Sequence, residues 1–203
     1  MGLLEKTFPG LAEIDQGIPV WEDNEKPWSI LGNSANNLID QIIEKNGGKE
    51  GPYIDPTAII GEFVTIEGEC YIGPRAEIRQ SAYLRKGSWV CEDAVVGHST
   101  EVKNSVLLPR SKAPHFNYVG DSIVGIDANL GAGVKLSNVR NDRGEVVVTL
   151  QDGVREKTGL KKMGALVGDG SQIGCNVVTN PGAILLPFSM VPPNETITGL
   201  FGS

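Results

Sequence analysis

The sequence predicts an all-β protein built as a parallel β-helix, and two regularities lead to this prediction. Between residues 54 and 113 an Ile, Leu or Val returns every six residues through ten repeats. The fifth position of the repeat is a short side chain in nine of the ten, with Lys112 as the exception. Neither the period of about 3.6 of a helix nor that of about 2 of a single strand produces such spacing.

A fixed six-residue period is typical of a solenoid in which each hexad forms one flat face and its corner. Three hexads then close one triangular coil. The aliphatic first residue is expected to fill the interior, and the short fifth residue to lie at the corner. A low aromatic content of 6% and 26 glycines agree with short strands separated by many corners.

Residues 1–50 lack the hexad and form a separate N-terminal segment ahead of the β-helix of residues 51–203. In residues 34–43 the apolar side chains lie on one face of a helix, for which Ser34 or Asn33 is the expected cap. Asn46 and the two glycines after it end that helix. Because a solenoid needs covered ends, we expect this helix to cap the open first coil. The alternative is a segment that docks a partner protein.

The hexad is interrupted twice, and each interruption predicts a loop that leaves the coil. The first covers residues 109–117, after which the repeat resumes at Tyr118. The second covers residues 137–160, where Asn141 to Gly144 reads as a turn before the strand-like run from Glu145 to Leu150. This second loop resembles a hairpin. Loops that leave a rigid scaffold often carry function.

Composition and charge exclude several classes of protein. The chain has 18 basic and 25 acidic residues, a net charge of −7, which argues against a nucleic-acid partner. The N-terminus lacks the pattern of a signal peptide, and no apolar run reaches membrane-spanning length. Three cysteines at unrelated spacings predict free thiols in a reducing compartment, so the cytoplasm is the expected location.

Two outward-facing cations are expected to lie close together on the solenoid surface. Residues 18 apart stack at a strand spacing of about 4.8 Å, and Arg85 and Lys103 are related in this way. Such cations repel each other unless an anion lies between them. Either Glu67 neutralises Arg85 as a surface ion pair, or a ligand supplies a phosphate or carboxylate.

His115 lies within the first predicted loop, and its neighbourhood to the stacked cations makes it the candidate proton acceptor. The alternative for a lone loop histidine is a solvated side chain. His98, at a corner, reads as surface. Cys70 falls at a short interior position, whereas Cys91 and Cys175 have no His or acid at a fixed spacing. We therefore expect no cysteine nucleophile and no metal site.

Five motifs in this sequence resemble those of a known family in their order and spacing, and the resemblance covers residues 54 to about 190. The family is the acetyltransferase domain of the bifunctional N-acetylglucosamine-1-phosphate uridylyltransferase/glucosamine-1-phosphate N-acetyltransferases. The motifs are Ala82-Tyr-Leu-Arg85, Glu101-Val-Lys103-Asn-Ser, His115-Phe-Asn-Tyr118-Val-Gly-Asp121, Asn129-Leu-Gly-Ala-Gly133 and Ser137-Asn138.

The resemblance implies a left-handed parallel β-helix of hexapeptide repeats and a homotrimer. It implies an N-acetyltransferase that uses acetyl-CoA as cosubstrate, requires no metal, and works in nucleotide-sugar biosynthesis. The amine of an amino-sugar phosphate such as glucosamine-1-phosphate attacks the thioester directly. His115 would be the general base and Glu101 would orient the sugar or the base. Arg85 and Lys103 would hold the sugar phosphate with help from Tyr118.

The remaining site residues also come from the resemblance. Asn129 and Asn138 would hydrogen-bond the sugar. The backbone of Ala132 would lie near the thioester, and Cys175 would lie beside the pantetheine of the coenzyme. Lys162 resembles a lysine that contacts the phosphate in archaeal relatives.

The sequence departs from the family after Asn138. The compact Cys-Asn-Tyr-Asp-Gly of the family is replaced by Val-Arg-Asn-Asp-Arg-Gly and a longer loop, which brings in Arg140 and Arg143. The family's nucleotidyltransferase motif is absent from residues 1–50, so no uridylyl transfer is expected. Two alternatives remain open. One is an N-acyltransferase for another amino sugar or nucleotide sugar, and the other is a non-catalytic trimeric module that binds a separate nucleotidyltransferase.

Overall fold

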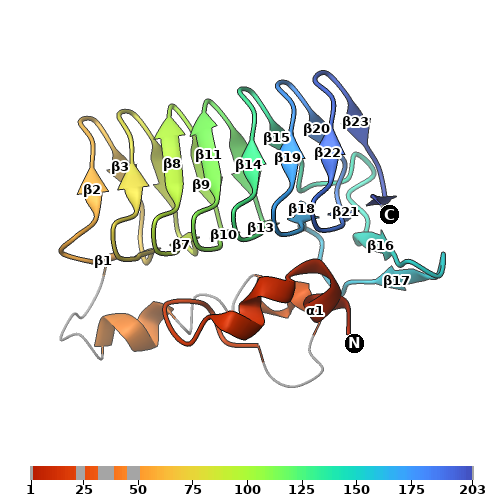
Figure 1. Ribbon diagram of the computed structural model, residues 1–203, viewed down its shortest axis with the longest axis horizontal. Helices are drawn as coiled ribbons and strands as arrows, with labels where there is room; N and C mark the ends of the chain where they lie inside the picture. Colours follow the sequence, from red (N-terminus) through yellow and green to blue (C-terminus); the bar gives the residue numbers. More distant parts are fainter. Residues whose placement is uncertain (1, 22–25, 32–38, 45–50, 203) are drawn as a thin grey trace.

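The computed structural model describes residues 2–21, 26–31, 39–44 and 51–202. From residue 51 onward the chain winds as a parallel β-helix of three sheets, which confirms the predicted fold (Figure 1). Successive strands pass to the next sheet and return to the first after one coil. All strand pairs within the three sheets are parallel, as shown by Tyr71 lying opposite Trp89 and Leu84 opposite Val102.

The strands of the described residues are two to four residues long and fall into three sheets and a hairpin. Sheet A contains β1 (Tyr53–Ile54), β4 (Tyr71–Ile72), β7 (Trp89–Val90), β10 (Val106–Leu107), β13 (Ile123–Val124), β18 (Ala165–Val167), β21 (Ala183–Leu185) and β24 (Leu200–Phe201). Sheet B contains β2 (Ile59–Ile60), β5 (Glu77–Ile78), β8 (Val95–His98), β11 (Lys112–His115), β14 (Asn129–Leu130), β19 (Gln172–Ile173) and β22 (Met190–Val191). Sheet C contains β3 (Thr65–Ile66), β6 (Tyr83–Arg85), β9 (Glu101–Lys103), β12 (Tyr118–Gly120), β15 (Lys135–Leu136), β20 (Val178–Thr179) and β23 (Thr196–Ile197).

The corners explain why the strands are short. The fourth residue of a hexad takes the left-handed backbone conformation that turns the chain, as at Asp93 (φ 56°) and Ser99 (φ 52°). The short fifth residue then points inward, and Ala94 and Thr100 are fully buried. Since only a small side chain fits inside a tight corner, the periodic short position seen in the sequence is a packing requirement.

The interior is a stack of aliphatic side chains, one from each face, as the hexad predicted. Val90, Val96 and Val102 come from three successive faces and are fully buried in it. Cys70 also points into this core, where burial raises the pKa of its thiol to about 11. Together with Cys91 and Cys175 it is a free cysteine, as predicted.

The predicted loop at residues 109–117 is wrong, because this stretch remains in the coil. Strand β11 pairs with β8 on one side and with β14 on the other. The interior positions run from Val102 to Leu107 and from Val119 to Val124, so these two faces have five residues where the faces next to them have six. Two faces that are each one residue short therefore look, in the sequence, like a single longer interruption of the hexad. As a result Tyr118 points outward, and Val119 fills the interior.

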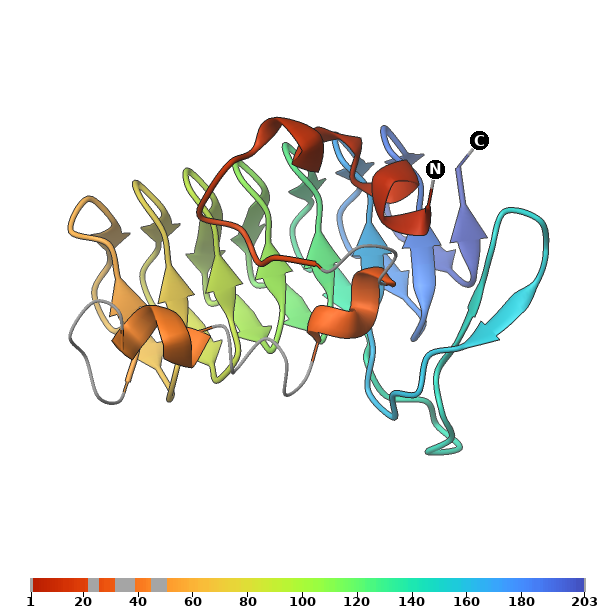
Figure 2. The ribbon, with the colours of Figure 1, turned by 90° about the horizontal axis from the view of Figure 1, so that it is seen from below.

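The second predicted loop does leave the coil, between the end of β15 and the start of β18. Its strands β16 (Val147–Thr149) and β17 (Arg155–Lys157) form an antiparallel hairpin. The hairpin projects from the C-terminal part of the solenoid, beside the last coils (Figure 2). The solenoid closes again behind it, since Val124 pairs directly with Val167.

The N-terminal segment lies along the outer face of sheet A (Figure 2). It contains the helix α1 (Leu3–Thr7), the 3-10 helices η1 (Pro9–Glu13) and η2 (Pro27–Ile30), and the helical residues 39–44. Phe8, Trp28 and Ile39 are buried against that face. Among the described residues, every helix is too short or too polar to cross a membrane.

An aromatic column on sheet A anchors this segment. Tyr53, Tyr71 and Trp89 stand in register on successive coils, with ring centroids 5.3 and 4.6 Å apart. The indole N–H of Trp89 donates to the carbonyl of Gly17 at 3.1 Å. The segment therefore covers a lateral face, in contrast to the predicted cap on the open first coil.

The helix predicted over residues 34–43 is present in its described part, residues 39–44. Its expected cap at Asn33 or Ser34 and its expected end at Asn46 lie outside the described residues. At the first coil the interior residues Ile54 and Ile60 are each 39% exposed, so the described residues leave that end of the solenoid open.

Asp169 connects the N-terminal segment to the solenoid. Its carboxylate, which is 6% exposed, accepts hydrogen bonds from the backbone N–H of Gly10 and of Ile126, both at 2.8 Å. Burial raises the pKa of this carboxyl group, while the two N–H donors oppose that shift. One side chain thus satisfies buried donors from two parts of the chain.

We expect Asp169→Ala to lower the free energy of unfolding by roughly 3 kcal/mol, because two buried N–H groups lose their acceptor. Chemical denaturation measures this. Asp127→Asn is the matched control, since Asp127 forms an exposed ion pair with Arg110, and it should cost far less. Equal losses in the two variants would contradict the role of Asp169.

Thr179 occupies an interior position between Leu136 and Ile197, and its hydroxyl has no hydrogen-bond partner in the described structure. Thr179→Val should therefore raise the free energy of unfolding by about 1 kcal/mol. Thr100→Val should have the opposite effect, because the Thr100 hydroxyl donates to the Ala113 carbonyl at 3.1 Å. Thermal melting of both variants tests the difference in sign.

Candidate active site

Sheet C brings the two predicted cations into register. Arg85, at the end of β6, lies directly opposite Lys103, at the end of β9. Each is neutralised by a carboxylate, since Arg85 donates to Glu101 at 3.0 Å and Lys103 to Asp121 at 3.0 Å. Glu67, the partner considered from the sequence, is 4.0 Å from Arg85 and therefore secondary. The stacked cations thus need no ligand to balance them.

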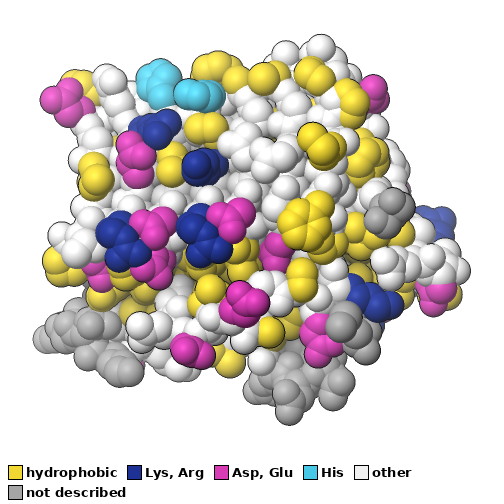
Figure 3. Space-filling model, in the orientation of Figure 1, with side chains coloured by type: hydrophobic (Ala, Val, Ile, Leu, Met, Phe, Trp, Pro, Cys, Tyr) yellow, Lys and Arg dark blue, Asp and Glu magenta, His cyan; other side chains and the backbone are white. Residues whose placement is uncertain are grey.

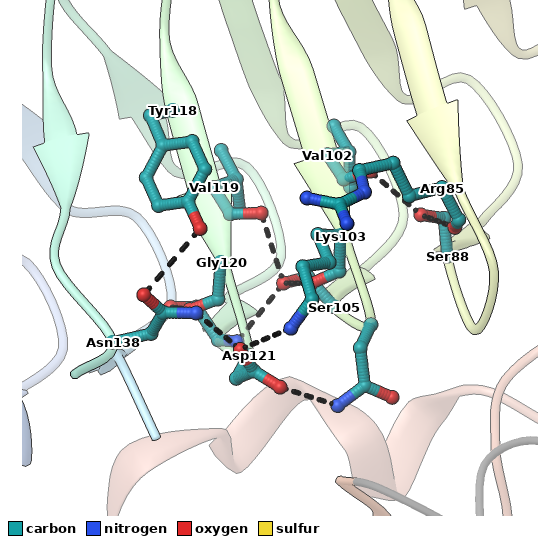
Figure 4. Close-up of polar contacts among 12 residues, drawn as sticks. Arg85, Ser88, Val102, Lys103, Ser105, Tyr118, Val119, Gly120, Asp121 and Asn138 are labelled. Carbon is teal, nitrogen blue, oxygen red and sulfur yellow. Dashed lines mark hydrogen bonds and ion pairs between the residues drawn. The ribbon is translucent and has the colours of Figure 1, made fainter. Parts of the chain in front are cut away.

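Asp121 is the centre of the polar cluster shown in Figure 4. It follows β12 in a left-handed backbone conformation (φ 45°) and is only 4% exposed. Its carboxylate accepts from the Lys103 ammonium, from the Asn104 side-chain amide at 2.7 Å, and from the Asn138 side-chain amide. Two donors from the end of β9 and one from the loop after β15 are held by one anion, which fixes the position of the Lys103 and Asn138 side chains.

Tyr118 and Asn138 form the side of the cluster nearest to β15. The Tyr118 hydroxyl donates to the Asn138 side-chain oxygen at 3.4 Å (Figure 4). Burial raises the pKa of Tyr118, so its hydroxyl stays protonated and available as a donor near neutral pH. The ring lies over Gly120, where an added Cβ would approach the hydroxyl oxygen to 2.7 Å. Gly120 therefore permits the tyrosine to lie flat on the sheet.

His115 lies at the end of β11, where the chain turns from sheet B to sheet C, and it is exposed. It stands in register with His98 on the preceding coil, and Figure 3 shows the two histidines side by side. Asn117 accepts a hydrogen bond from the backbone N–H of His115 at 3.0 Å and secures the turn. Among the described residues Glu101 bonds Arg85 and makes no hydrogen bond to His115.

The remaining predicted site residues lie outside sheet C: in sheet B, at the corner after it, and where the hairpin returns to the solenoid. Asn129 begins β14 in sheet B, next to Lys112 of β11. Ala132 and Cys175 lie at the same corner on adjacent coils, because Asn176 donates to the Ala132 carbonyl at 2.8 Å. Cys175 is exposed there. Lys162 pairs with Val139, next to Asn138, where the chain returns from the hairpin.

The structure thus gathers Arg85, Glu101, Lys103, Tyr118 and Asn138 on the outer face and end of sheet C. His115 lies at the corner between sheets B and C, away from the carboxyl ends of β9 and β12, and Ala132 and Cys175 follow it along that corner on the next coils.

Sequence reasoning gave no role to Asp121 and Asn104, which organise the cluster. Asp121 is the last residue of the His115–Asp121 motif, but only the fold reveals that its carboxylate is buried beneath Lys103. Among the described residues, no group of three His, Cys, Asp or Glu side chains could hold a metal ion.

A three-sided parallel solenoid with polar side chains gathered on one sheet and its corner defines the hexapeptide-repeat class of proteins. Residues 66–197 match the profile of the family described as GMPPB C-terminal domain. The chain belongs to this family.

Two curated relatives show what the chain resembles. It is 35% identical over 185 residues to the bifunctional sugar-1-phosphate nucleotidylyltransferase/acetyltransferase of Sulfurisphaera tokodaii, a match that covers 87% of this chain and 46% of the relative. It is 36% identical over 192 residues to the bifunctional protein GlmU of Methanococcus vannielii, with 86% and 43% covered. These matches confirm the resemblance based on the motifs. The chain spans less than half the length of these relatives.

Solved structures show weaker likeness. The acetyltransferase domain of PglB from Neisseria gonorrhoeae is 17% identical, with a TM-score of 0.31, over 81% of this chain and 64% of that one. WeeI from Acinetobacter baumannii is 16% identical, with a TM-score of 0.29, over 97% and 89%. Scores this low add nothing to the strand order described above.

We expect Asp121→Asn to lower the free energy of unfolding by about 2 kcal/mol, because a charged hydrogen bond to Lys103 becomes a neutral one at a buried position. Asp142→Asn is the control. Asp142 also pairs with a cation, Arg140, but on the exposed surface, and its change should leave the melting temperature nearly unaltered. Equal melting temperatures for both variants would show that Asp121 organises nothing.

Proposed function

We propose that the protein is an N-acetyltransferase that transfers the acetyl group of acetyl-CoA to the amine of an amino-sugar phosphate, for example glucosamine-1-phosphate. The observation that carries the proposal is that His115 ends β11 at the corner that leads into β12, whose first residue, Tyr118, hydrogen-bonds Asn138 of the polar cluster. The confirmed resemblance to bifunctional nucleotidyltransferase/acetyltransferases supports the same reaction.

In the proposed reaction the amine nitrogen attacks the carbonyl carbon of the thioester, and His115 accepts the proton that the nitrogen loses. The carbon–sulfur bond then breaks, and the proton passes to the departing thiolate of the coenzyme. No covalent enzyme intermediate is needed, so alignment of the two substrates supplies much of the rate. An exposed imidazole on a rigid strand end is suited to this task.

The polar cluster would bind the acceptor. Lys103 and Arg85 each carry a carboxylate partner, and a sugar phosphate would compete with Glu101 and Asp121 for them. Tyr118 supplies a neutral donor, and Asn129 and Asn138 supply amides for the hydroxyl groups of the sugar. Glu101 would act by placing Arg85, which it hydrogen-bonds.

The coenzyme would lie along the corner between sheets B and C, past Ala132 and Cys175. We also propose a homotrimer in which a neighbouring copy closes this exposed corner. The absence of a required metal, the cytoplasmic location and a separate nucleotidyltransferase partner remain predictions from the sequence.

A non-catalytic binding module is the second candidate. The ion pairs that already neutralise Arg85 and Lys103 favour it, since a surface that is balanced by its own carboxylates needs no anionic substrate. The two candidates differ in one property: only the enzyme releases thiol from acetyl-CoA.

We predict that the wild-type protein releases thiol from acetyl-CoA when glucosamine-1-phosphate is present, and that His115→Ala lowers the rate about 100-fold or more, because the general base is lost. His98→Ala is the matched control, one coil away in the same register, and should retain the wild-type rate. Thiol release is followed by a chromogenic disulfide reagent.

An equal loss in the two histidine variants would contradict the role of His115. No release from the wild type, together with no thermal stabilisation by millimolar CoA, would favour the binding module.

A further inference from the structure

A surface hollow lies between the β16–β17 hairpin and the last coils, and none of the candidate site residues named above lines it. It has a volume of about 960 Å³, which is in the range of small-molecule sites. One wall contains Arg140 and Arg155, and the opposite wall contains Asn180 and Thr198. We call this hollow the hairpin groove.

The groove has a defined wall because the hairpin has two different faces. Val148 is buried in the apolar layer beneath sheet A, and Glu156, its partner in the hairpin, bonds Lys26 of the N-terminal segment at 3.1 Å. Thr149 and Arg155, which pair with each other, line the groove. The N-terminal segment therefore holds one face of the hairpin and leaves the other facing the groove.

Close backbone contact seats the base of the hairpin on the solenoid. Gly182, with φ 81°, lies so near that an added Cβ would be 2.7 Å from the Val147 carbonyl oxygen. On the opposite wall the Asn180 side-chain amide donates to the Thr198 hydroxyl at 2.7 Å. Both walls are thus held by contacts of the described residues.

The charge of the groove favours an anion. Arg75, Arg79, Arg85, Arg110 and Arg140 all hydrogen-bond carboxylates. Arg143 and Arg155 make no such bond within the described part of the chain, although the protein carries a net charge of −7, and of these two Arg155 lines the groove. Asp142, which also lines the groove, is already held by Arg140. The lining therefore presents one guanidinium in excess, next to neutral hydrogen-bonding groups.

The groove continues the candidate acceptor site. Ser137 and Val139 line it, and Asn138 between them hydrogen-bonds Asp121 and Tyr118 of the cluster. Lys162 stands beside Val139 at the same boundary. On successive coils of sheet C, the positions that follow one another in register are Lys103, Gly120, Ser137 and Asn180. Lys103, Lys162 and Arg155 thus supply cationic groups at the cluster, at the boundary and in the groove.

We propose that the acceptor is a nucleoside-diphosphate amino sugar, whose phosphate chain passes Lys103 and Lys162 and whose nucleoside lies in the hairpin groove. Arg155 would bind the diphosphate, and the apolar side chains of Leu150 and Leu200 would contact the base. A sugar monophosphate would leave the groove empty. This inference rests on the proposed acetyl transfer and names the substrate class for it.

The first test measures binding directly, without catalysis. Titration calorimetry with UDP, GDP, dTDP and CDP should detect binding of at least one of them. For that nucleotide, Arg155→Ala should weaken binding about tenfold or more, because a charge-assisted contact to phosphate is lost. Arg110→Ala, which removes an arginine from an exposed ion pair outside the groove lining, is the control and should bind as the wild type does.

The second test compares acceptors. The glucosamine derivative of the nucleotide that binds should have a kcat/KM at least tenfold above that of glucosamine-1-phosphate. Arg155→Ala should reduce this ratio, and Arg110→Ala should not.

Four results separate the possibilities. If none of the four nucleotides binds, or if Arg155→Ala and Arg110→Ala behave alike, the groove assignment is wrong whatever the activity. Binding in the groove with preference for the monophosphate as acceptor would overturn the substrate class alone. Arg155-dependent binding without thiol release from any acceptor would mean that the proposed acetyl transfer has failed while the groove assignment stands.

Discussion

The register between coils is the constraint on which the rest of the structure depends. Backbone hydrogen bonds hold each strand about 4.8 Å from its counterpart on the next coil, so a side chain is placed by its position in the hexad. Arg85 opposite Lys103, and His98 opposite His115, follow from this alone. A shift of one residue on any face would exchange interior and exterior side chains.

Two buried carboxylates perform comparable tasks at different corners. Asp121 collects the donors of Lys103, Asn104 and Asn138, and Asp169 accepts backbone N–H groups from the N-terminal segment and from β13's corner at Ile126. Each attaches to the solenoid a residue outside its strand pairs, Asn138 in the first case and Gly10 in the second. The regular hydrogen bonds thus build the scaffold, and single anions attach to it the elements that differ from coil to coil.

The two regions where the hexad is interrupted differ in how the fold accommodates a face that is shorter or longer than six residues. The one-residue shortenings around β11 are absorbed within the coil, and their effect is to turn Tyr118 outward beside Glu101. The long insertion after β15 cannot be absorbed, so it folds as its own hairpin and forms a wall beside Asn138. The candidate acceptor site lies between these two departures from the repeat.

The sequence by itself determined the parallel β-helix, its interior column and the excursion after residue 137, because six-residue spacing and loss of that spacing are local properties. It also placed Arg85 over Lys103, since stacking follows from counting. Only the tertiary structure decided that residues 109–117 stay in the coil, that the described residues of the N-terminal segment cover sheet A, and that Asp121 anchors Lys103. These outcomes depend on contacts between distant residues, whose energies no local pattern records.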